Sequence, residues 1–256
     1  MSKRAKIIIT TILLAVGFVG INLIENEFKT AGILGLSLAT LLLFTWSLKE
    51  GIGFNATALV LVLPALYTLG VGIFWFLLPA SLVARVPVIL LYSIGIYSLA
   101  LTNNIFTVSA VRTIALSRAA KGVGFVLTLF TAFLLYDAIL SLKAQIFVNT
   151  LLIYLVSFPL FLQGLWMSKI TKNIDKELFI FSAILSYLVT TSAIFLYFWP
   201  VTLVVGSIFL TVEVYVYLGL GQARVEGRLF RQTLREYALV GILVFLTTII
   251  VTNWRG

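Results

Sequence analysis

A carboxylic acid inside an apolar run is the first feature of this chain that could do chemistry. Glu213 lies two or three residues past the middle of the run 201–220. An ionised carboxylate there would cost about 2.5–3.5 kcal/mol to insert, so it should face protein or water, or carry a proton. Tyr217 follows at i+4, on the same helix face, where it could hydrogen-bond with the acid. The pair predicts either a proton- or cation-binding site or a structural tie between helices, the latter being the commoner role.

A second acid, Asp137, lies in the apolar run 122–142. The helical rise places it about 7–8 Å outward of the membrane midplane. Two interpretations stay open for this position. In the first, Asp137 is a second carboxylate in the same pathway as Glu213, or lies at the outer mouth of such a pathway. In the second, it is an interfacial acid hydrated from outside.

Polar and small residues recur on one face of the run 86–106. Ser93, Tyr97, Ala100 and Asn104 follow each other at i, i+4, i+7 and i+11, and Asn103 adds a further amide. Because amides in hydrocarbon need partners, this face is predicted to point into the bundle. It either lines a cavity or holds helices together. With Glu213, Tyr217 and Asp137, we take Tyr97 and Asn104 as candidate transport or ion-coupling residues.

Two prolines interrupt apolar runs. Pro64 and Pro159 each lack an N–H, which frees the carbonyls of Val60 and Leu155 respectively. Bare carbonyls of broken helices coordinate ions in some transporters, although proline kinks without such a role are commoner. Small residues at four-residue spacing in the segment 31–39 are predicted to serve close helix packing only.

Four arginines near the C-terminus, Arg224, Arg228, Arg231 and Arg235, have 4-3-4 spacing. On a helix they fall within an arc of about 60°. The segment 222–237 is therefore predicted to be a basic amphipathic helix in the plane of the cytoplasmic interface. Anionic phospholipid headgroups are the expected partner, because each basic residue near such a surface contributes about 1 kcal/mol. A phosphate-bearing substrate or a partner protein is the alternative.

The composition requires lipid around these residues. The chain has 256 residues, of which 61% are hydrophobic and only 11% charged, and its mean hydropathy is +1.14. A soluble domain of this size cannot hide so much apolar surface. We therefore expect an all-α polytopic transmembrane helix bundle, with the whole chain forming a single integral membrane domain.

Nine runs have about the length needed to cross the bilayer, and eight is the main alternative because the last run is short. The expected spans are 7–23, 31–48, 56–78, 86–106, 122–142, 146–167, 178–197, 201–220 and 238–252.

The distribution of Lys and Arg indicates the orientation. With a cytoplasmic N-terminus, 14 of the 18 basic residues fall in inner segments. These are Lys3, Arg4, Lys6, Lys49, Arg112, Arg118, Lys121, Lys169, Lys172, Lys176, Arg224, Arg228, Arg231 and Arg235; the four outer residues are Lys29, Arg85, Lys143 and Arg255. The positive-inside rule thus supports this layout, and we expect a multi-pass protein of the plasma membrane.

The residue types exclude several function classes. The chain has no Cys and no His, which removes thiolate chemistry, imidazole–metal sites and His proton relays. No P-loop and no paired Asp-rich motif is present. We expect no cofactor and no metal. Nucleic acid is not expected either, because the basic residues lie in short segments between apolar runs.

Three hypotheses remain for the function. The first is a small-solute or ion permease with Glu213 as the coupling carboxylate. The second is a non-catalytic scaffold or assembly partner that docks through its basic cytoplasmic face, with a membrane protein or a second copy as partner. The third, an enzyme on lipid-linked substrates using Asp137 or Glu213, is the least expected, because the two acids lie at different depths.

Overall fold

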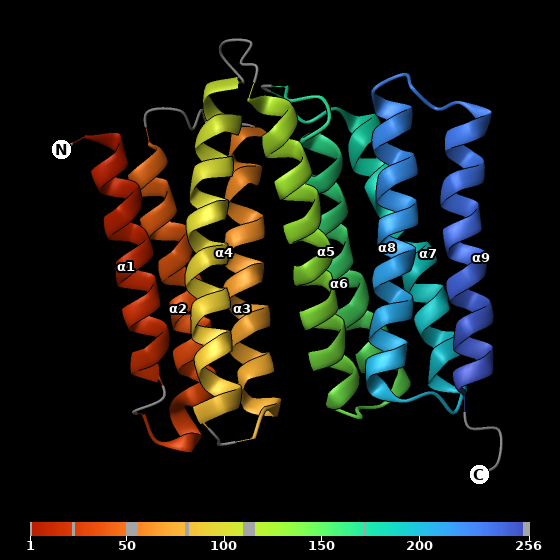
Figure 1. The fold of residues 1–256 in the computed structure, drawn as a ribbon, viewed down its shortest axis with the longest axis horizontal. Coiled ribbons are helices and arrows are strands. Elements are labelled where there is room, and N and C mark those ends of the chain that lie inside the picture. Colours follow the sequence, from red (N-terminus) through yellow and green to blue (C-terminus); the bar gives the residue numbers. More distant parts are fainter. Residues whose placement is uncertain are drawn as a thin grey trace. The chain divides into compact units, whose positions relative to one another are not determined.

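The computed structural model describes residues 2–21, 24–49, 56–79, 82–109, 116–171 and 173–252. Within these residues the chain is all-helical, with nine α-helices long and apolar enough to cross a membrane (Figure 1). The helices are α1 (Lys3–Ile21), α2 (Asn26–Leu48), α3 (Val62–Leu77), α4 (Leu82–Ser109), α5 (Ser117–Ser141), α6 (Ile146–Trp166), α7 (Lys176–Tyr197), α8 (Leu203–Val225) and α9 (Arg231–Val251), with a 3₁₀ turn η1 (Ala56–Leu61) before α3. The expected helical class and the nine expected segments are confirmed, and they fit a multi-pass membrane protein. Residues 22 and 23 of the first expected span lie outside the described residues.

The helices divide into two compact units. Unit 1 comprises Met1–Thr131 with Ile170–Asn173, and unit 2 comprises Ala132–Lys169 with Ile174–Gly256. The boundary falls inside α5, so that its first part belongs to unit 1 and its last part to unit 2.

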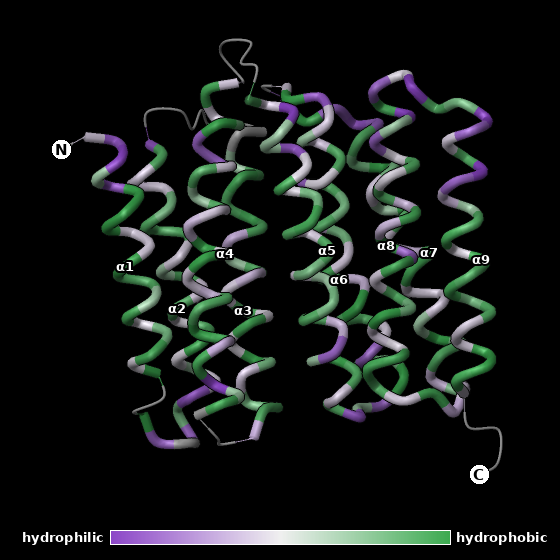
Figure 2. Tube along the Cα trace, viewed as in Figure 1, coloured by the Kyte–Doolittle hydropathy of each residue, from purple (hydrophilic) through white to green (hydrophobic). Residues whose placement is uncertain are grey.

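The apolar middle of each helix is what a lipid environment demands. Figure 2 shows hydrophobic residues along the helices and hydrophilic ones mainly towards their ends. Hydroxyl groups within the helices are satisfied locally, since Thr11 donates to the carbonyl of Ile7 at 3.0 Å and Thr45 to that of Leu41 at 2.7 Å. This back-bonding lets Ser and Thr reside in an apolar medium.

An aromatic cluster forms the core of unit 1. Phe18 stacks on Tyr92 with ring centroids 4.4 Å apart and meets Trp75 edge-on at 5.4 Å. Tyr67 lies against Tyr92 at 6.0 Å and against Phe130 at 6.2 Å. The cluster thereby joins α1, α3, α4 and the first part of α5.

Gly95 allows Tyr67 to reach the backbone of α4. A Cβ atom at this glycine would collide with the Tyr67 hydroxyl. That hydroxyl donates to the carbonyl of Leu91 at 2.7 Å. A buried phenol is thus satisfied by close approach to a helix backbone.

The carbonyl freed by Pro64 has a partner. Pro64 lies in the first turn of α3, directly after η1, and it cannot donate to Val60. The Asn103 side chain supplies the missing donor, with its Nδ2 2.6 Å from the Val60 carbonyl oxygen. Both residues are fully buried. Pro64 is therefore part of a structural contact between η1 and α4, and Pro159 lies inside α6 as expected.

The predicted packing role of the small residues in segment 31–39 is wrong for the described residues. Ala31 and Gly35 are exposed, Ala39 is half-buried, and a Cβ atom at Gly35 would meet nothing within 4 Å. Close approach occurs instead at Gly17 and Gly72, where a Cβ atom would lie 2.8 Å from Leu36 and 2.7 Å from Ile33. The sequence spacing identified a face of small residues, but two of the three, Ala31 and Gly35, point outward.

The predicted amphipathic helix over 222–237 is also wrong. Helix α8 continues to Val225 and α9 begins at Arg231. Gly227 separates them with a φ of +69°. Its N–H donates to the carbonyl of Arg224 at 3.0 Å, and that of Arg228 donates to Ala223 at 2.8 Å. This pair of bonds is a Schellman C-cap, which ends a helix at a glycine that adopts the left-handed conformation.

The contact between Asn103 and the carbonyl of Val60 can be tested with a double-mutant cycle. Asn103→Leu should lower the free energy of unfolding by about 1–3 kcal/mol, because it leaves a buried carbonyl unsatisfied. Pro64→Ala restores a backbone N–H in this turn and should recover part of that loss. Thermal unfolding in detergent measures both effects. Strict additivity of the two substitutions would contradict the assignment.

Candidate functional site

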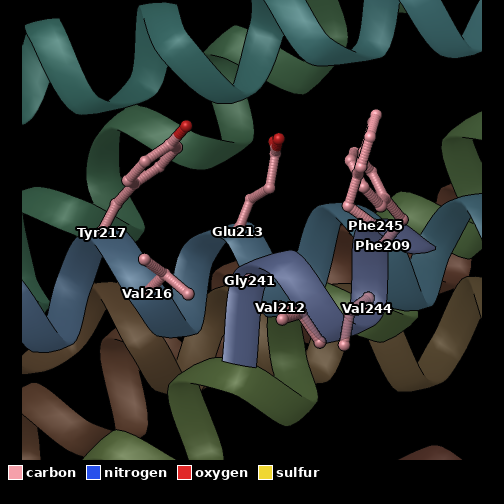
Figure 3. Close-up of a pocket in the computed structure, with 8 residues that line it drawn as sticks. All are labelled: Phe209, Val212, Glu213, Val216, Tyr217, Gly241, Val244 and Phe245. Atoms are coloured by element: carbon pink, nitrogen blue, oxygen red, sulfur yellow. The ribbon is translucent and has the colours of Figure 1, made fainter. Parts of the chain in front are cut away.

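Glu213 lies near the middle of α8 and borders a groove between α8 and α9. Figure 3 shows its carboxyl pointing to the same side as the Tyr217 hydroxyl, towards α7. The groove has a volume of about 200 Å³. Its lining residues are Phe209, Val212, Glu213, Val216 and Tyr217 from α8 and Gly241, Val244 and Phe245 from α9. All of them belong to unit 2.

The carboxyl of Glu213 is incompletely satisfied. Its Oε2 atom is buried and has no hydrogen-bond partner among the described residues. The hydroxyl of Ser192, on α7, interacts with the carboxyl. The side chains of Tyr136 and Tyr217 lie close enough to interact with it electrostatically. No ion pair with Glu213 is formed in the part of the chain that the structure describes. The groove thus holds an acid without a countercharge.

Aromatic residues fix how α9 packs on α8. The ring of Tyr237 covers Gly219, where an added Cβ atom would collide with it, and lies 5.1 Å from the ring of Tyr215. Towards the other end of α9, Phe245 contacts Trp199 edge-on at 5.9 Å and Phe209 at 6.4 Å. The groove beside Glu213 lies between these two aromatic contacts.

Asp137 is buried inside unit 2 and has a partner. Its side chain is 6% exposed, and its Oδ1 accepts a hydrogen bond from Ser207 Oγ at 3.1 Å. This contact ties α5 to α8. Ser207 precedes Glu213 by six residues, which corresponds to about 9 Å along the helix axis. Within unit 2, Asp137 is therefore a buried and hydrogen-bonded acid, and its role as a second carboxylate of a pathway stays a prediction.

Tyr136, next to Asp137, makes a parallel contact. Its hydroxyl lies 2.7 Å from Ser157 Oγ on α6, and both side chains are fully buried. The face of α5 towards α6 and α8 therefore carries polar groups at two successive residues. The hydrogen bond expected between Tyr217 and Glu213 is not among those formed in the described residues.

The candidates on α4 belong to unit 1. Tyr97 is 41% exposed, so the prediction that the whole polar face points into the bundle is wrong at this position. Asn104 is half-buried and its Oδ1 lacks a partner, whereas Ser93 bonds to the carbonyl of Ile89 in its own helix at 2.8 Å. The neighbour Asn103 has the clear structural role described above. Neither Tyr97 nor Asn104 lines the Glu213 groove.

The four arginines flank the α8–α9 turn. Arg224, in the last turn of α8, lies over the ring of Phe181 at 5.3 Å, and Arg228 pairs with Glu226. Arg231 and Arg235 are exposed on the first turns of α9. Three further residues used for the orientation, Arg112, Lys172 and Arg255, lie outside the described residues.

The sequence did not identify Ser192 and Ser207 as neighbours of the two acids. Each is one of several hydroxyl residues in an apolar run, and most of the others bond only to their own helix. No local feature of the sequence distinguishes Ser192 and Ser207 from the hydroxyl residues that bond only to their own helix. Gly241 and Phe245 were missed because the groove depends on how α9 packs against α8.

Comparison with known proteins identifies a family without an assigned activity. Residues 8–251 match DUF5656, described as a protein of unknown function. Because the match covers nearly the whole chain, the chain belongs to this family. None of the curated proteins or solved structures is significantly similar to it.

The two acids should differ in reactivity towards dicyclohexylcarbodiimide, a lipid-soluble reagent for protonated carboxyls. Glu213 borders a groove and has an unpaired oxygen, whereas Asp137 is buried and holds a hydrogen bond of about 1–1.5 kcal/mol, which predicts labelling about tenfold lower at Asp137. Mass spectrometry of the labelled protein locates the adduct. Glu213→Gln should abolish it and Asp137→Asn should preserve it; equal labelling of both acids would contradict the assignment.

Proposed function

We propose that this member of the DUF5656 family is a permease that moves a small cation, or a small solute together with a proton or cation, across a membrane. The observation that carries this proposal is the Oε2 atom of Glu213, which is buried and unpaired beside a groove. Polar groups buried in a lipid-exposed bundle are normally satisfied. An acid without a countercharge is suited to bind a mobile cation or proton.

The groups around Glu213 favour a singly charged ion. They provide oxygen atoms from one carboxylate and from hydroxyls such as that of Ser192. In the described residues no group of three or more acidic, His or Cys side chains could hold a metal ion. One carboxylate compensates one positive charge, so protons and monovalent cations fit this arrangement better than divalent ones.

Asp137 extends the proposal along α8. Asp137 accepts a hydrogen bond from Ser207. Ser207 lies about 9 Å from Glu213 along the axis of α8. Two carboxyls at successive levels beside α8, one from α5 and one from α8 itself, would give a cation two sites at different depths. In this scheme Asp137 is the second site, and Tyr217 borders the first.

The orientation belongs to the same proposal. With the N-terminus in the cytoplasm of a plasma-membrane protein, the α8–α9 turn lies on the cytoplasmic side, where anionic headgroups would contact Arg224, Arg231 and Arg235. The turn that replaces the expected helix still presents these side chains to the surroundings.

A scaffold function is the second candidate. It is favoured by the exposure of Arg228, Arg231 and Arg235 around one turn, a surface that a protein partner could recognise. The two functions depend on different residues, transport on Glu213 and docking on the arginines. Charge reversal at Arg228 and Arg231 should disrupt docking of a scaffold while sparing transport.

Reconstitution into liposomes tests the permease. The vesicles would contain a dye sensitive to pH, to Na⁺ or to K⁺, matched to the ion whose gradient is imposed, and the three gradients would be tested in turn. Wild-type protein should dissipate at least one gradient. Glu213→Gln should slow this flux at least about tenfold, the effect of losing a charged ligand worth about 1.5–3 kcal/mol.

Glu177→Gln is the matched control, because Glu177 is exposed at the start of α7 and lies outside the groove. Its flux should equal that of the wild type. A wild-type protein that moves none of the three ions, or a Glu213→Gln variant as fast as the wild type, would contradict the proposal.

A further inference from the structure

We propose that the groove beside Glu213 binds a small organic cation, an ammonium ion that carries alkyl groups, in preference to a bare metal ion. The proposal rests on the transport function above and names the chemical class of its cation. The groove lies within unit 2, between the middle parts of α8 and α9.

The charge of the lining suits a monovalent cation with an apolar body. Glu213 alone is charged among the eight described residues that line the groove. Neither a basic side chain nor a second acid is among them, and apart from Tyr217 the others are apolar or glycine. One negative charge in an apolar lining matches a ligand with one positive charge and an apolar remainder.

The groove offers few oxygen atoms to a bare metal ion. Among its described lining residues, Glu213 and Tyr217 alone carry a polar side chain. Ser192, which interacts with the Glu213 carboxyl, does not line the groove. Helices α8 and α9 contain no proline, so no backbone carbonyl is released from the helical hydrogen bonds. Because Na⁺ or K⁺ must exchange its water shell for several protein oxygens, this lining favours a cation whose charge is covered by carbon.

Aromatic rings lie on both sides of the acid. Figure 3 shows the Tyr217 ring on one side of the Glu213 carboxyl, and the rings of Phe209 and Phe245 on the other. The centroids of the two phenylalanine rings are 6.4 Å apart. The face of an aromatic ring attracts a cation within about 6 Å, and more strongly where water is excluded. An ammonium ion in the groove would therefore gain aromatic contacts as well as a countercharge.

Phe245 is held in place and still partly uncovered. Its ring meets Trp199 edge-on at 5.9 Å. Gly241, one turn earlier on α9, has no side chain to fill the space beside it. Phe245 remains 45% exposed. The alkyl groups of a ligand in the groove can thus cover a ring that the fold leaves open.

The volume of the groove limits the size of the ligand. It is about 200 Å³, the space of roughly six to seven water molecules at about 30 Å³ each. Short-chain alkylammonium ions are of this size, whereas drug-sized ligands occupy pockets of about 300–1,000 Å³. Tetraethylammonium is therefore a suitable probe.

Equilibrium dialysis of radiolabelled tetraethylammonium against the purified protein in an uncharged detergent tests the site. The wild type should bind the probe saturably, and NaCl or KCl at equal concentration should compete far less than unlabelled probe. Glu213→Gln should raise the apparent dissociation constant at least about tenfold, because it removes the countercharge. Phe245→Leu keeps an apolar side chain without the ring and should raise the constant about threefold.

Phe147→Leu is the matched control. Phe147 lies at the start of α6 in the same unit, is 82% exposed and lines no part of the groove. This variant should keep the wild-type dissociation constant. If Glu213→Gln does not fold, the comparison of the two leucine variants still tests the site.

Three results would overturn the proposal: no saturable binding, competition by Na⁺ or K⁺ as strong as that by unlabelled probe, or equal affinities of Phe245→Leu and Phe147→Leu. These results are distinguishable from a failure of the transport function. Flux of ions in liposomes without binding of tetraethylammonium rejects the organic cation and leaves the permease. Binding by a protein that dissipates no gradient supports the site and rejects transport.

Discussion

Polar groups in an apolar medium need partners within the protein, and this constraint governs the structure. The carbonyl released by Pro64 is satisfied by Asn103 from another helix, and the Tyr67 phenol reaches a backbone carbonyl across Gly95. Asp137 accepts a hydrogen bond from Ser207 on another helix. Each contact both removes an unsatisfied group and joins two elements. Several buried amide oxygens, such as that of Asn104, also lack a partner among the described residues, but in Glu213 the unpaired atom belongs to a carboxylic acid beside a groove, which suits it to bind a cation or a proton.

The difference between the two acids follows from their neighbours. Asp137 lies among residues that are buried within unit 2, and a serine on the adjacent helix donates to it. Glu213 lies where α9 leaves a groove, because Tyr237 packs closely over Gly219 while Gly241 contributes no side chain farther along. The same helix α8 thus carries one contact that stabilises the fold and one group that remains available to a ligand.

The sequence predicted the helices well and their faces poorly. Length and hydropathy were sufficient to place nine apolar segments, because a bilayer sets the length of a span. Helices that are apolar all round do not reveal which side meets lipid, so the exposure of Tyr97 and of Gly35 could not be foreseen. Gly227 did carry a signal, since a glycine within a basic segment is a common helix C-cap. The groove beside Glu213 depends on packing between helices and had no sequence signature.

Water access to position 213 tests the central claim most directly. The chain has no cysteine, so a single Glu213→Cys substitution gives one thiol, with Val214→Cys as the buried neighbour for comparison. A charged, membrane-impermeant thiol reagent should modify Glu213→Cys from one side of sealed vesicles and leave Val214→Cys unmodified. Protection of Glu213→Cys from both sides would show that the carboxyl lies in a dry helix contact and would contradict the account.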